Sequence, residues 1–569
     1  MNKNQKGTPV MRQFWEMKRS NPDSILLFRM GDFYETFEED AKTTSKILGI
    51  TLTKRSNGAA SDVPLAGFPF HALDQYLHKL LKSGHRVAIC EQVEDPKDAK
   101  GIVKREVVEI ASPGTSISEN YLDQEENNYL ASIVFDRNKL GISILDYSTG
   151  EFKGITVPID SMGQIISQYN IKELIISESQ HEAFHHIIKK YDFLITKVPN
   201  WYLDIKIAND YLKDHFNLIS LKGFGIQNEP LLIKSAAFAL DYVDKNYCGK
   251  IEHIINFKKI QEENIMILDS YTIKNLELFK SISRGDKNGT LINSIDSTKT
   301  SSGSRLLKKW ILHPLTDKNK INDRLYRIEE MNNNTEVRDF IIKELNETSD
   351  IERILSKTSA NKSTPRDFIS MANTLESLND ISKKISKNKF KYNHKLLSSK
   401  QNLKSLISLI NKTIIQEPPL NHLKGSFIKD GVDSNLDEYR KISKNAKDWL
   451  VNYQVKIQEK TKINKIKIGY NRVFGYYIEV TNPHLDKIPD NFIRKQTLTN
   501  AERYFTEELK DYEEKILSAE ENIVKIEVEL FNKLRDKLLT QIKGLLHNAM
   551  ILSRLDISSS LSKVSQDKI

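Results

Sequence analysis

The sequence contains one pattern that is typical of a metal-dependent hydrolase. His181-Glu182-Ala183-Phe184-His185 matches the H-E-x-x-H motif, which on a helix places two imidazoles on one face for zinc and supplies a glutamate as general base. The motif needs a third ligand. Its extended form expects glycine and histidine where this sequence has Ile188 and Tyr191, and Asp204 is an acidic alternative. Because the neighbouring residues are cationic, an exposed helix face is favoured over a zinc cavity.

A second group of residues is suited to binding a polyanion. The chain has a formal net charge of +9, and ten cationic against two acidic residues lie between Arg440 and Arg472, a net charge of +8 within 33 residues. A local field of this size attracts nucleic acid. A solvated, lysine-rich helix face is the alternative that charge alone leaves open.

Composition and missing motifs exclude several classes of protein. With 39% hydrophobic and 28% charged residues, the 569-residue chain is typical of a soluble globular protein, with room for about four domains. It has no apolar run long enough for a membrane span and no signal-peptide core. Its two cysteines, Cys90 and Cys248, cannot form a disulfide framework or a four-thiolate zinc site, which favours the cytoplasm. No Gly-x4-Gly-Lys-Ser/Thr loop, Gly-x-Ser-x-Gly elbow or Cys-x-x-Cys pair is present.

Hydrophobic patterning predicts two α/β domains in the first 250 residues. In residues 1–115, strand-like runs alternate with helical patterns, which favours a mixed sheet with helical cover. In residues 122–248, three short strands separated by polar turns predict an antiparallel meander, followed by helices. The elements of the first domain are expected at residues 24–30, 37–48, 72–83, 86–90 and 106–110, and the meander strands at residues 130–135, 141–147 and 151–155.

From about residue 250 the pattern changes to long helices. Apolar residues at 505–530 follow the alternating 4-3 spacing of a coiled-coil seam, and we expect one helix over residues 500–543. An apolar stripe at 436–457 predicts a partner helix. Between the two helices, residues 465–480 change to alternation, which predicts a small β-tip. The expected architecture is therefore two antiparallel helices that carry a cationic β-tip.

The run Phe28-Arg29-Met30-Gly31-Asp32-Phe33-Tyr34-Glu35-Thr36-Phe37 contains a Phe-x-Glu pattern at Phe33 and Glu35. It resembles the signature of the MutS family of DNA mismatch-recognition proteins, whose mark is Phe-x-Glu. Further blocks that look like family blocks follow in family order across nearly the whole chain. They are Thr51–Arg55, Pro64–His71, Val87–Gln92, Ser112–Thr115, Ser302–Trp310, Asn471–Glu479 and Gln496–Tyr504. A small departure is Phe70, where the family usually has tyrosine.

The resemblance implies a multidomain fold that combines small mixed α/β domains with an all-α core. Residues 1–115 would form the mismatch-recognition domain, and residues 116–249 an RNase H-like connector. Residues 250–435 and 506–569 would form a core of long helical levers, into which a clamp of residues 436–505 is inserted. The clamp would grip the DNA backbone, and its helix pair and β-tip coincide with the cationic cluster.

The resemblance also implies that Phe33 and Glu35 contact the mismatch. In an extended segment, residues two apart share a face, so these two side chains would point the same way while Tyr34 points back. An aromatic ring can wedge between base steps at an unstacking cost of about a few kcal/mol per step. A mismatched step is weakly stacked and bends easily, so the same wedge costs less there. The Glu35 carboxyl would meet a base-edge donor, or donate when protonated.

Cationic residues in two of the expected domains are candidates for contacts with the DNA backbone. Lys54 and Arg55 follow the Phe-x-Glu segment in the first domain. The candidates in the clamp are Lys462, Lys465, Lys467, Arg472, Arg494 and Lys495.

Cofactors and partners are expected from the resemblance alone. Family members continue into an ATPase and dimerisation domain, bind ATP and magnesium, form homodimers and recruit a MutL-type partner. This sequence contains no phosphate-binding loop before Ile569, so we expect a shortened relative or a piece of a longer protein, with no enzymatic activity, cofactor or metal of its own. The expected partner is mismatched or looped double-stranded DNA in the cytoplasm, at the nucleoid, with no membrane partner.

Two other interpretations are open at this point. A metal-dependent hydrolase would be either a nuclease that uses the RNase H-like domain or a zinc enzyme with ligands His181 and His185. A nuclease needs clustered carboxylates for two metal ions, and Asp146 stands nearly alone in its strand. A coiled-coil protein without a ligand is the third interpretation, and it would leave the cationic cluster unexplained.

Overall fold

The computed structural model contains two compact units. Unit 1 consists of Met1–Ser363, Asn373–Leu403 and Gln541–Ile569, and unit 2 of Thr364–Ala372 and Lys404–Thr540. Within the described ranges, no helix combines the length and apolar character that a membrane crossing requires. The residues that the structure describes are 8–57, 60–94, 101–188, 191, 193–261, 265–420, 425–471 and 475–567.

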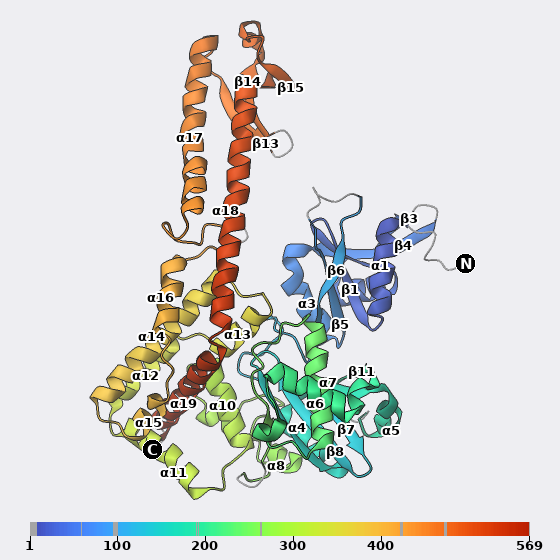
Figure 1. Cartoon of the computed structure of the whole chain (residues 1–569), viewed down its shortest axis with the longest axis vertical. Coiled ribbons are helices and arrows are strands. Elements are labelled where there is room, and N and C mark those ends of the chain that lie inside the picture. Colours follow the sequence, from blue (N-terminus) through green and yellow to red (C-terminus); the bar gives the residue numbers. More distant parts are fainter. Residues whose placement is uncertain are drawn as a thin grey trace. The chain divides into compact units, whose positions relative to one another are not determined.

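The N-terminal part of unit 1, blue in Figure 1, is built on a six-stranded mixed sheet. Its strand order is β3-β4-β2-β1-β5-β6. The β1 and β5 strands are parallel, and the other neighbouring pairs are antiparallel. The predicted mixed sheet with helical cover is confirmed. Its elements are α1 (Pro9–Ser20), β1 (Ser24–Met30), β2 (Phe33–Phe37), α2 (Glu38–Leu48), β3 (Thr53–Asn57), β4 (Ala60–Pro69), α3 (Leu73–Lys82), β5 (Arg86–Gln92) and β6 (Arg105–Ala111).

This first sheet has an apolar core on each face, because successive strand residues point to opposite sides. On one face, Tyr34 and Phe68 pack in a cluster with Leu77 of α3. On the other face, the Phe37 ring packs edge-on against Phe14 of α1, with 4.9 Å between the ring centroids. The α1 helix, which covers this second face, was not among the predicted elements. The two cores hold β2 in the middle of the sheet.

A second six-stranded sheet follows, with the strand order β11-β10-β7-β8-β9-β12. Its β7, β8 and β9 strands form the predicted antiparallel meander, which is confirmed, and β10 pairs in parallel with β7 and β11. The elements are β7 (Tyr129–Asp136), β8 (Lys139–Asp146), β9 (Glu151–Pro158), α4 (Met162–Tyr169), β10 (Ile171–Ser177), α5 (Glu178–Ile188), β11 (Leu194–Val198), α6 (Ile205–Phe216), α7 (Pro230–Asn246) and β12 (Lys258–Lys259).

Helices dominate the rest of unit 1, as the sequence predicts. The buried Arg305 of α10 makes ion pairs with Asp350 (2.6 Å) and Glu352 (2.7 Å), both at the start of α13. The helices are α8 (Ser270–Asn275), α9 (Leu291–Ile295), α10 (Ser301–Leu312), α11 (Lys318–Asn332), α12 (Thr335–Asn346), α13 (Ile351–Ser359), α15 (Tyr392–Ser398) and α19 (Ile542–Asp567), and α14 (Pro365–Lys387) contributes residues to both units.

Unit 2 contains two long helices, α17 and α18, that lie side by side (Figure 1). The Trp449 ring of α17 stacks on the Tyr512 ring of α18 at a centroid distance of 3.6 Å. Both predicted apolar stripes contribute buried residues, although Ile442 is 37% exposed. Between these helices, four strands form an antiparallel sheet in the order β13-β14-β16-β15. The elements are α16 (Lys404–Thr413), α17 (Ser434–Thr461), β13 (Lys467–Asn471), β14 (Gly475–Thr481), β15 (Ile493–Thr497), β16 (Ala501–Phe505) and α18 (Glu507–Leu539).

The predicted single helix over residues 500–543 is wrong at both ends. Its first residues form β16, which pairs with β14 and β15, and α18 begins after Thr506, whose hydroxyl accepts a hydrogen bond from the Leu509 N–H (3.1 Å). Phe505 fits the seam spacing but lies on a strand. The helix ends at Leu539. Heptad spacing marks the buried face of a helix, but it does not fix the residue at which the helix starts.

Candidate nucleic-acid interface

Phe33 lies at the end of a β-hairpin, and its side chain is exposed. The β1 and β2 strands pair Met30 with Phe33, so the turn is Gly31-Asp32. Gly31 has a φ of 56°, a conformation that glycine adopts without strain. Phe33 is 47% exposed, whereas Tyr34 is 2% exposed. The predicted opposite orientation of these neighbours is confirmed, and the Phe33 ring is accessible.

Glu35 shares the face of Phe33 but is held by an ion pair. Its Oε2 atom lies 2.7 Å from Nη1 of Arg55, and both side chains are partly buried. Burial raises the pKa of Glu35, although the Arg55 guanidinium acts in the opposite direction. The carboxyl therefore takes up a proton more readily than an exposed glutamate does.

Gly67 creates the space in which the Glu35 side chain lies. Gly67 of β4 pairs directly with Glu35 of β2. A Cβ atom at residue 67 would lie 2.8 Å from the Tyr34 carbonyl oxygen and 3.4 Å from Cγ of Glu35. A side chain at residue 67 would therefore clash with the backbone of β2 and touch the Glu35 side chain, whose carboxylate meets the Arg55 guanidinium across β4, the strand between β2 and β3.

Beside the hairpin, the Arg29 guanidinium lies over the Phe70 ring. The sequence did not predict this contact. The Arg29 guanidinium lies 3.7 Å from the Phe70 ring centroid and 3.5 Å from a Glu91 carboxylate oxygen. On the buried face, the Tyr34 hydroxyl donates a hydrogen bond to Glu91, and burial and Glu91 together raise the Tyr34 pKa. Each of these residues lies inside a sequence block that resembles the family, and only this resemblance could have identified them as candidate site residues.

The two backbone candidates of the first sheet differ in their surroundings. Lys54 is exposed, and no ion pair involves it within the described residues. Arg55, its neighbour on β3, is paired with Glu35. The structure therefore brings Arg55 to the Phe-x-Glu segment, whereas Lys54 keeps an exposed ammonium group.

The candidates of the small four-stranded sheet are mostly exposed. Lys462 follows the last residue of α17 in a left-handed conformation, with a φ of 58°. Arg494 makes an exposed ion pair with Glu502 (3.3 Å), and Nζ of Lys495 lies 5.0 Å from the Phe505 ring centroid. Arg472 lies outside the described residues. The candidates with exposed side chains are Lys462, Lys465, Lys467 and Arg494.

Part of the cationic cluster is paired with acidic side chains of unit 2. Nη2 of Arg440 lies 2.6 Å from Oε1 of Glu527, a fully buried carboxylate on α18, and Nη1 lies 2.6 Å from Asp430. Lys456 pairs with Glu508 across the two helices (2.9 Å). The formal charge of +8 therefore overstates the unpaired positive charge of the cluster.

The alternative zinc site has two histidines close together, without a third ligand among the described residues. His181 and His185 lie on α5 with their ring centroids 5.5 Å apart. Asp204 accepts hydrogen bonds from Lys206 N and Ile207 N as the N-cap of α6. In the ranges that the structure describes, no three His, Cys, Asp or Glu side chains are grouped to hold a metal ion. The zinc interpretation is not favoured.

The alternative nuclease site is not favoured either. Asp146 is fully buried, and its carboxylate accepts hydrogen bonds from Asn127 Nδ2 (2.6 Å), Ser148 N (2.9 Å) and Ser148 Oγ (2.7 Å). The two Ser148 bonds close the turn between β8 and β9, and the Asn127 bond ties the segment before β7 to it. The Asp146 carboxylate is used structurally, and Glu151, opposite it on β9, is paired with Lys153 and Lys309. Among the described residues, no three metal-binding side chains are grouped here.

Comparisons with known proteins find relatives that match nearly the whole chain. Models of three families match it: MutS domain I over residues 8–120, MutS domain II over residues 128–254 and MutS domain III over residues 271–562. Proteins named DNA mismatch repair protein MutS from Salinibacter ruber and Phocaeicola vulgatus are each 40% identical, and one from Flavobacterium johnsoniae is 41% identical, over 98% of this chain. The chain spans 62%, 64% and 64% of their lengths. Because the domain III match alone covers more than half of the 569 residues, the chain belongs to the MutS family.

Proposed function

We propose that this chain recognises mismatched or looped double-stranded DNA in mismatch repair. The observation that carries the proposal is the 47% exposure of Phe33 at the end of a rigid hairpin, two residues from a partly buried carboxyl. The relatives named above, which are DNA mismatch repair proteins, support the same substrate. Membership of the family gives the biological process, and the hairpin gives a physical means of recognition.

The Phe33 ring would act as a wedge. Unstacking a base step costs about a few kcal/mol, and this cost is lowest at a mismatched or unpaired step. A wedge can therefore discriminate by the deformability of the duplex without reading its sequence. The buried neighbours of Phe33 on β2, Tyr34 and Phe37, would keep the strand from yielding as the ring enters.

Glu35 would contact the edge of a base beside the wedge. Its pKa is raised by burial, and the Arg55 guanidinium limits that rise. If Arg55 turns toward a phosphate, Glu35 loses its partner, and its carboxyl can bind a proton and donate a hydrogen bond. The ion pair would thus keep the carboxyl ionised until DNA arrives.

Residues 436–505 would form a clamp that holds the backbone of the duplex. Its proposed contacts are the exposed cations of the small sheet, which provide charge without sequence specificity. We propose residues 1–115 as the mismatch-recognition domain, 116–249 as an RNase H-like connector, and 250–435 with 506–569 as a lever core. The clamp contacts are Lys462, Lys465, Lys467, Arg472, Arg494 and Lys495, and Lys54 and Arg55 are the contacts of the first domain.

The remaining properties are proposed on family membership alone. A full-length family protein would bind ATP and magnesium, act as a homodimer, recruit a MutL-type partner and work at the nucleoid in the cytoplasm. No residue discussed above carries these properties, and they are separable from recognition of the mismatch by this chain.

Competitive binding to two duplexes that differ in one base pair tests the proposed function. We expect the 569-residue chain to bind a duplex with a single mismatch or one unpaired nucleotide more tightly than the fully paired duplex of the same sequence. Measurements at several salt concentrations separate the contribution of phosphate contacts from the preference for the mismatch. Phosphate contacts weaken with salt equally for both duplexes, so they do not change the ratio of the two affinities. Equal affinity for both duplexes at every salt concentration would contradict the proposal.

A further inference from the structure

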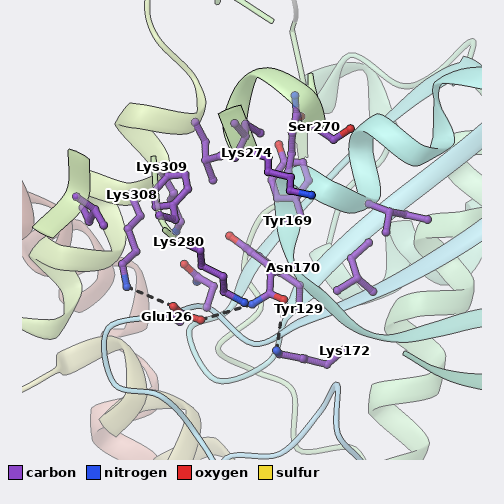
Figure 2. A pocket seen from close by; sticks show the side chains of 18 of the residues that line it. Glu126, Tyr129, Tyr169, Asn170, Lys172, Ser270, Lys274, Lys280, Lys308 and Lys309 are labelled. Atoms are coloured by element: carbon purple, nitrogen blue, oxygen red, sulfur yellow. Dashed lines mark hydrogen bonds and ion pairs between the residues drawn. The ribbon is translucent and has the colours of Figure 1, made fainter. Parts of the chain in front are cut away.

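A cavity of about 720 Å³ lies within unit 1, between the second sheet domain and the helices that follow it. Its walls come from two separate stretches of the chain, residues 125–193 and residues 270–313. Figure 2 shows Tyr129, Tyr169, Asn170 and Lys172 from the first stretch and Lys274, Lys280, Lys308 and Lys309 from the second. A volume of this size is typical of sites that bind small molecules.

The lining of the cavity is strongly cationic. Seven of its side chains carry a positive charge and two carry a negative charge. Four of the cations have acidic partners: Lys287 with Glu125 (3.1 Å), Lys308 with Glu126 (3.6 Å), Lys309 with Glu151 (2.7 Å) and Arg305 with Asp350 (2.6 Å). The other three lining cations are Lys172, Lys274 and Lys280.

These three lysines are free to meet a ligand. In the part of the chain that the structure describes, none of them makes an ion pair, and the one hydrogen bond is from Lys172 Nζ to the Asn170 Oδ1 atom (3.4 Å). Lys274 and Lys280 are exposed and Lys172 is partly buried. Figure 2 shows that Asn170 also bridges to Glu126, which in turn faces Lys308. Positive charge that acidic residues do not neutralise is suited to an anion.

Planar rings line the same cavity. The Tyr169 ring is inclined by 35° to the His313 ring at a centroid distance of 5.5 Å, and the Tyr191 and Phe193 rings stack at 5.6 Å. His313 Nε2 is buried, and no hydrogen-bond partner is found for it within the described residues. Burial lowers the His313 pKa to about 4, so the ring is neutral near pH 7. A neutral imidazole and several aromatic faces are partners for a planar heterocycle.

We propose that this cavity binds a small phosphorylated ligand with a planar ring, the chemistry of a mononucleotide. The phosphate would lie against Lys172, Lys274 and Lys280, and the ring against the partly buried rings of His313, Tyr191 and Phe193. An isolated phosphate would leave the aromatic surface uncovered, and an uncharged ring would leave the three ammonium groups without a counterion. A duplex is too large for the cavity. This site is separate from the Phe33 hairpin and does not depend on the proposed function.

Calorimetric titration of the 569-residue chain with adenosine monophosphate, adenosine and inorganic phosphate tests the proposal. We expect saturable binding of adenosine monophosphate at one site and at least tenfold weaker binding of the other two probes. Equal binding of adenosine would overturn the role of the lysines, and equal binding of phosphate would overturn the role of the rings. The chain contains no Gly-x4-Gly-Lys-Ser/Thr loop, so bound nucleotide does not report on such a loop.

Two charge-reversal variants locate the site. Lys274→Glu with Lys280→Glu should weaken binding of adenosine monophosphate at least tenfold, and because both side chains are exposed, the fold should persist, as circular dichroism can check. The matched control is Lys387→Glu with Lys389→Glu, two exposed lysines of unit 1 that do not line the cavity, which should leave this binding unchanged. Absence of saturable binding to the wild-type chain, or equal losses in both double variants, would overturn the proposal.

Discussion

Glu35 Oε2 and Arg55 Nη1 lie 2.7 Å apart although β4 separates the strands that carry them. This ion pair stands two residues from the exposed Phe33 ring. It places a carboxyl with a raised pKa, and the cation that opposes the rise, beside the proposed mismatch contact. Recognition would therefore depend on pH as well as on the shape of the duplex.

Removal of the Arg55 charge should raise the Glu35 pKa further. The folded-state pKa already lies above that of an exposed glutamate because burial outweighs Arg55. A raised pKa means that the folded state binds more protons, so this group's contribution to stability falls as pH rises from the unfolded pKa through the folded one. Carbon-13 NMR of labelled glutamate carboxyls should show a higher Glu35 pKa in Arg55→Met than in the wild-type chain.

The neighbouring lysine provides the control for that titration. Lys54→Met removes an equal charge from the same strand without removing the partner of Glu35, so it should leave the Glu35 pKa nearly unchanged. Glu35→Gln should abolish the assigned titration. An unchanged Glu35 pKa in Arg55→Met would contradict the inferred coupling.

Exposed lysines of the small sheet should set the salt dependence of DNA binding. If Lys465 and Lys467 each neutralise one phosphate, alanine at either position should reduce the slope of log K against log salt by about 0.9. Both losses should be equal for mismatched and paired duplexes, because phosphate contacts carry no base information. The measurement is fluorescence anisotropy over a range of salt concentrations.

A lysine outside this sheet provides the control. It tests whether the slope of log K against log salt depends on where a lysine lies or only on the net charge of the chain. Lys383 of α14 is 69% exposed, and Lys383→Ala should leave the slope unchanged. Equal reductions in Lys383→Ala and Lys465→Ala would mean that total charge, and not a clamp, determines the binding.

Arg440 should matter for stability more than for DNA. Its guanidinium is the charged partner of Glu527, whose side chain is fully buried and also accepts a hydrogen bond from Phe427 N (3.0 Å). Removing one member of a buried ion pair costs about 3–5 kcal/mol. Arg440→Met should therefore accelerate amide hydrogen exchange in α17 and α18.

Arg494→Met is the matched comparison for Arg440→Met. Arg494 also has an acidic partner, but its side chain is 64% exposed, and such pairs contribute about 0–1 kcal/mol. We expect little change in exchange for Arg494→Met. If the amides of α17 and α18 were equally protected from exchange in the two variants, the ion pair between Arg440 and Glu527 would not contribute to stability as inferred.

Periodicity in the sequence predicted many individual helices and strands of this fold, but it did not predict which strands pair over long distances in the chain. Alternation located the β7–β9 meander, and the strand at Ser24–Met30 was predicted with its observed bounds. Phe505 was assigned to a helix because its spacing from Leu509 matches a heptad, whereas pairing with β15 places it on a strand. The pairing of Phe505 depends on residues of β15, which the spacing of apolar residues around Phe505 does not reveal.

The candidate site shows the same limit. The family resemblance located Phe33 and Glu35, and alternation predicted that Tyr34 would point away from them. The Arg55 partner of Glu35 could not be predicted, because it requires the order of three strands and the absence of a side chain at Gly67. Likewise, charge counting located the cationic cluster, but only the packing of α17 on α18 shows that Arg440 and Lys456 are paired.

The most direct test of the central claim is the effect of Phe33→Ala on discrimination between a mismatched duplex and its paired counterpart. The control is Leu52→Ala, because Leu52 is a 46% exposed apolar residue of the same domain. We predict that Phe33→Ala lowers the ratio of the two affinities at least tenfold, about 1.4 kcal/mol, while Leu52→Ala preserves it. An unchanged ratio in Phe33→Ala, with both affinities reduced equally, would contradict the wedge.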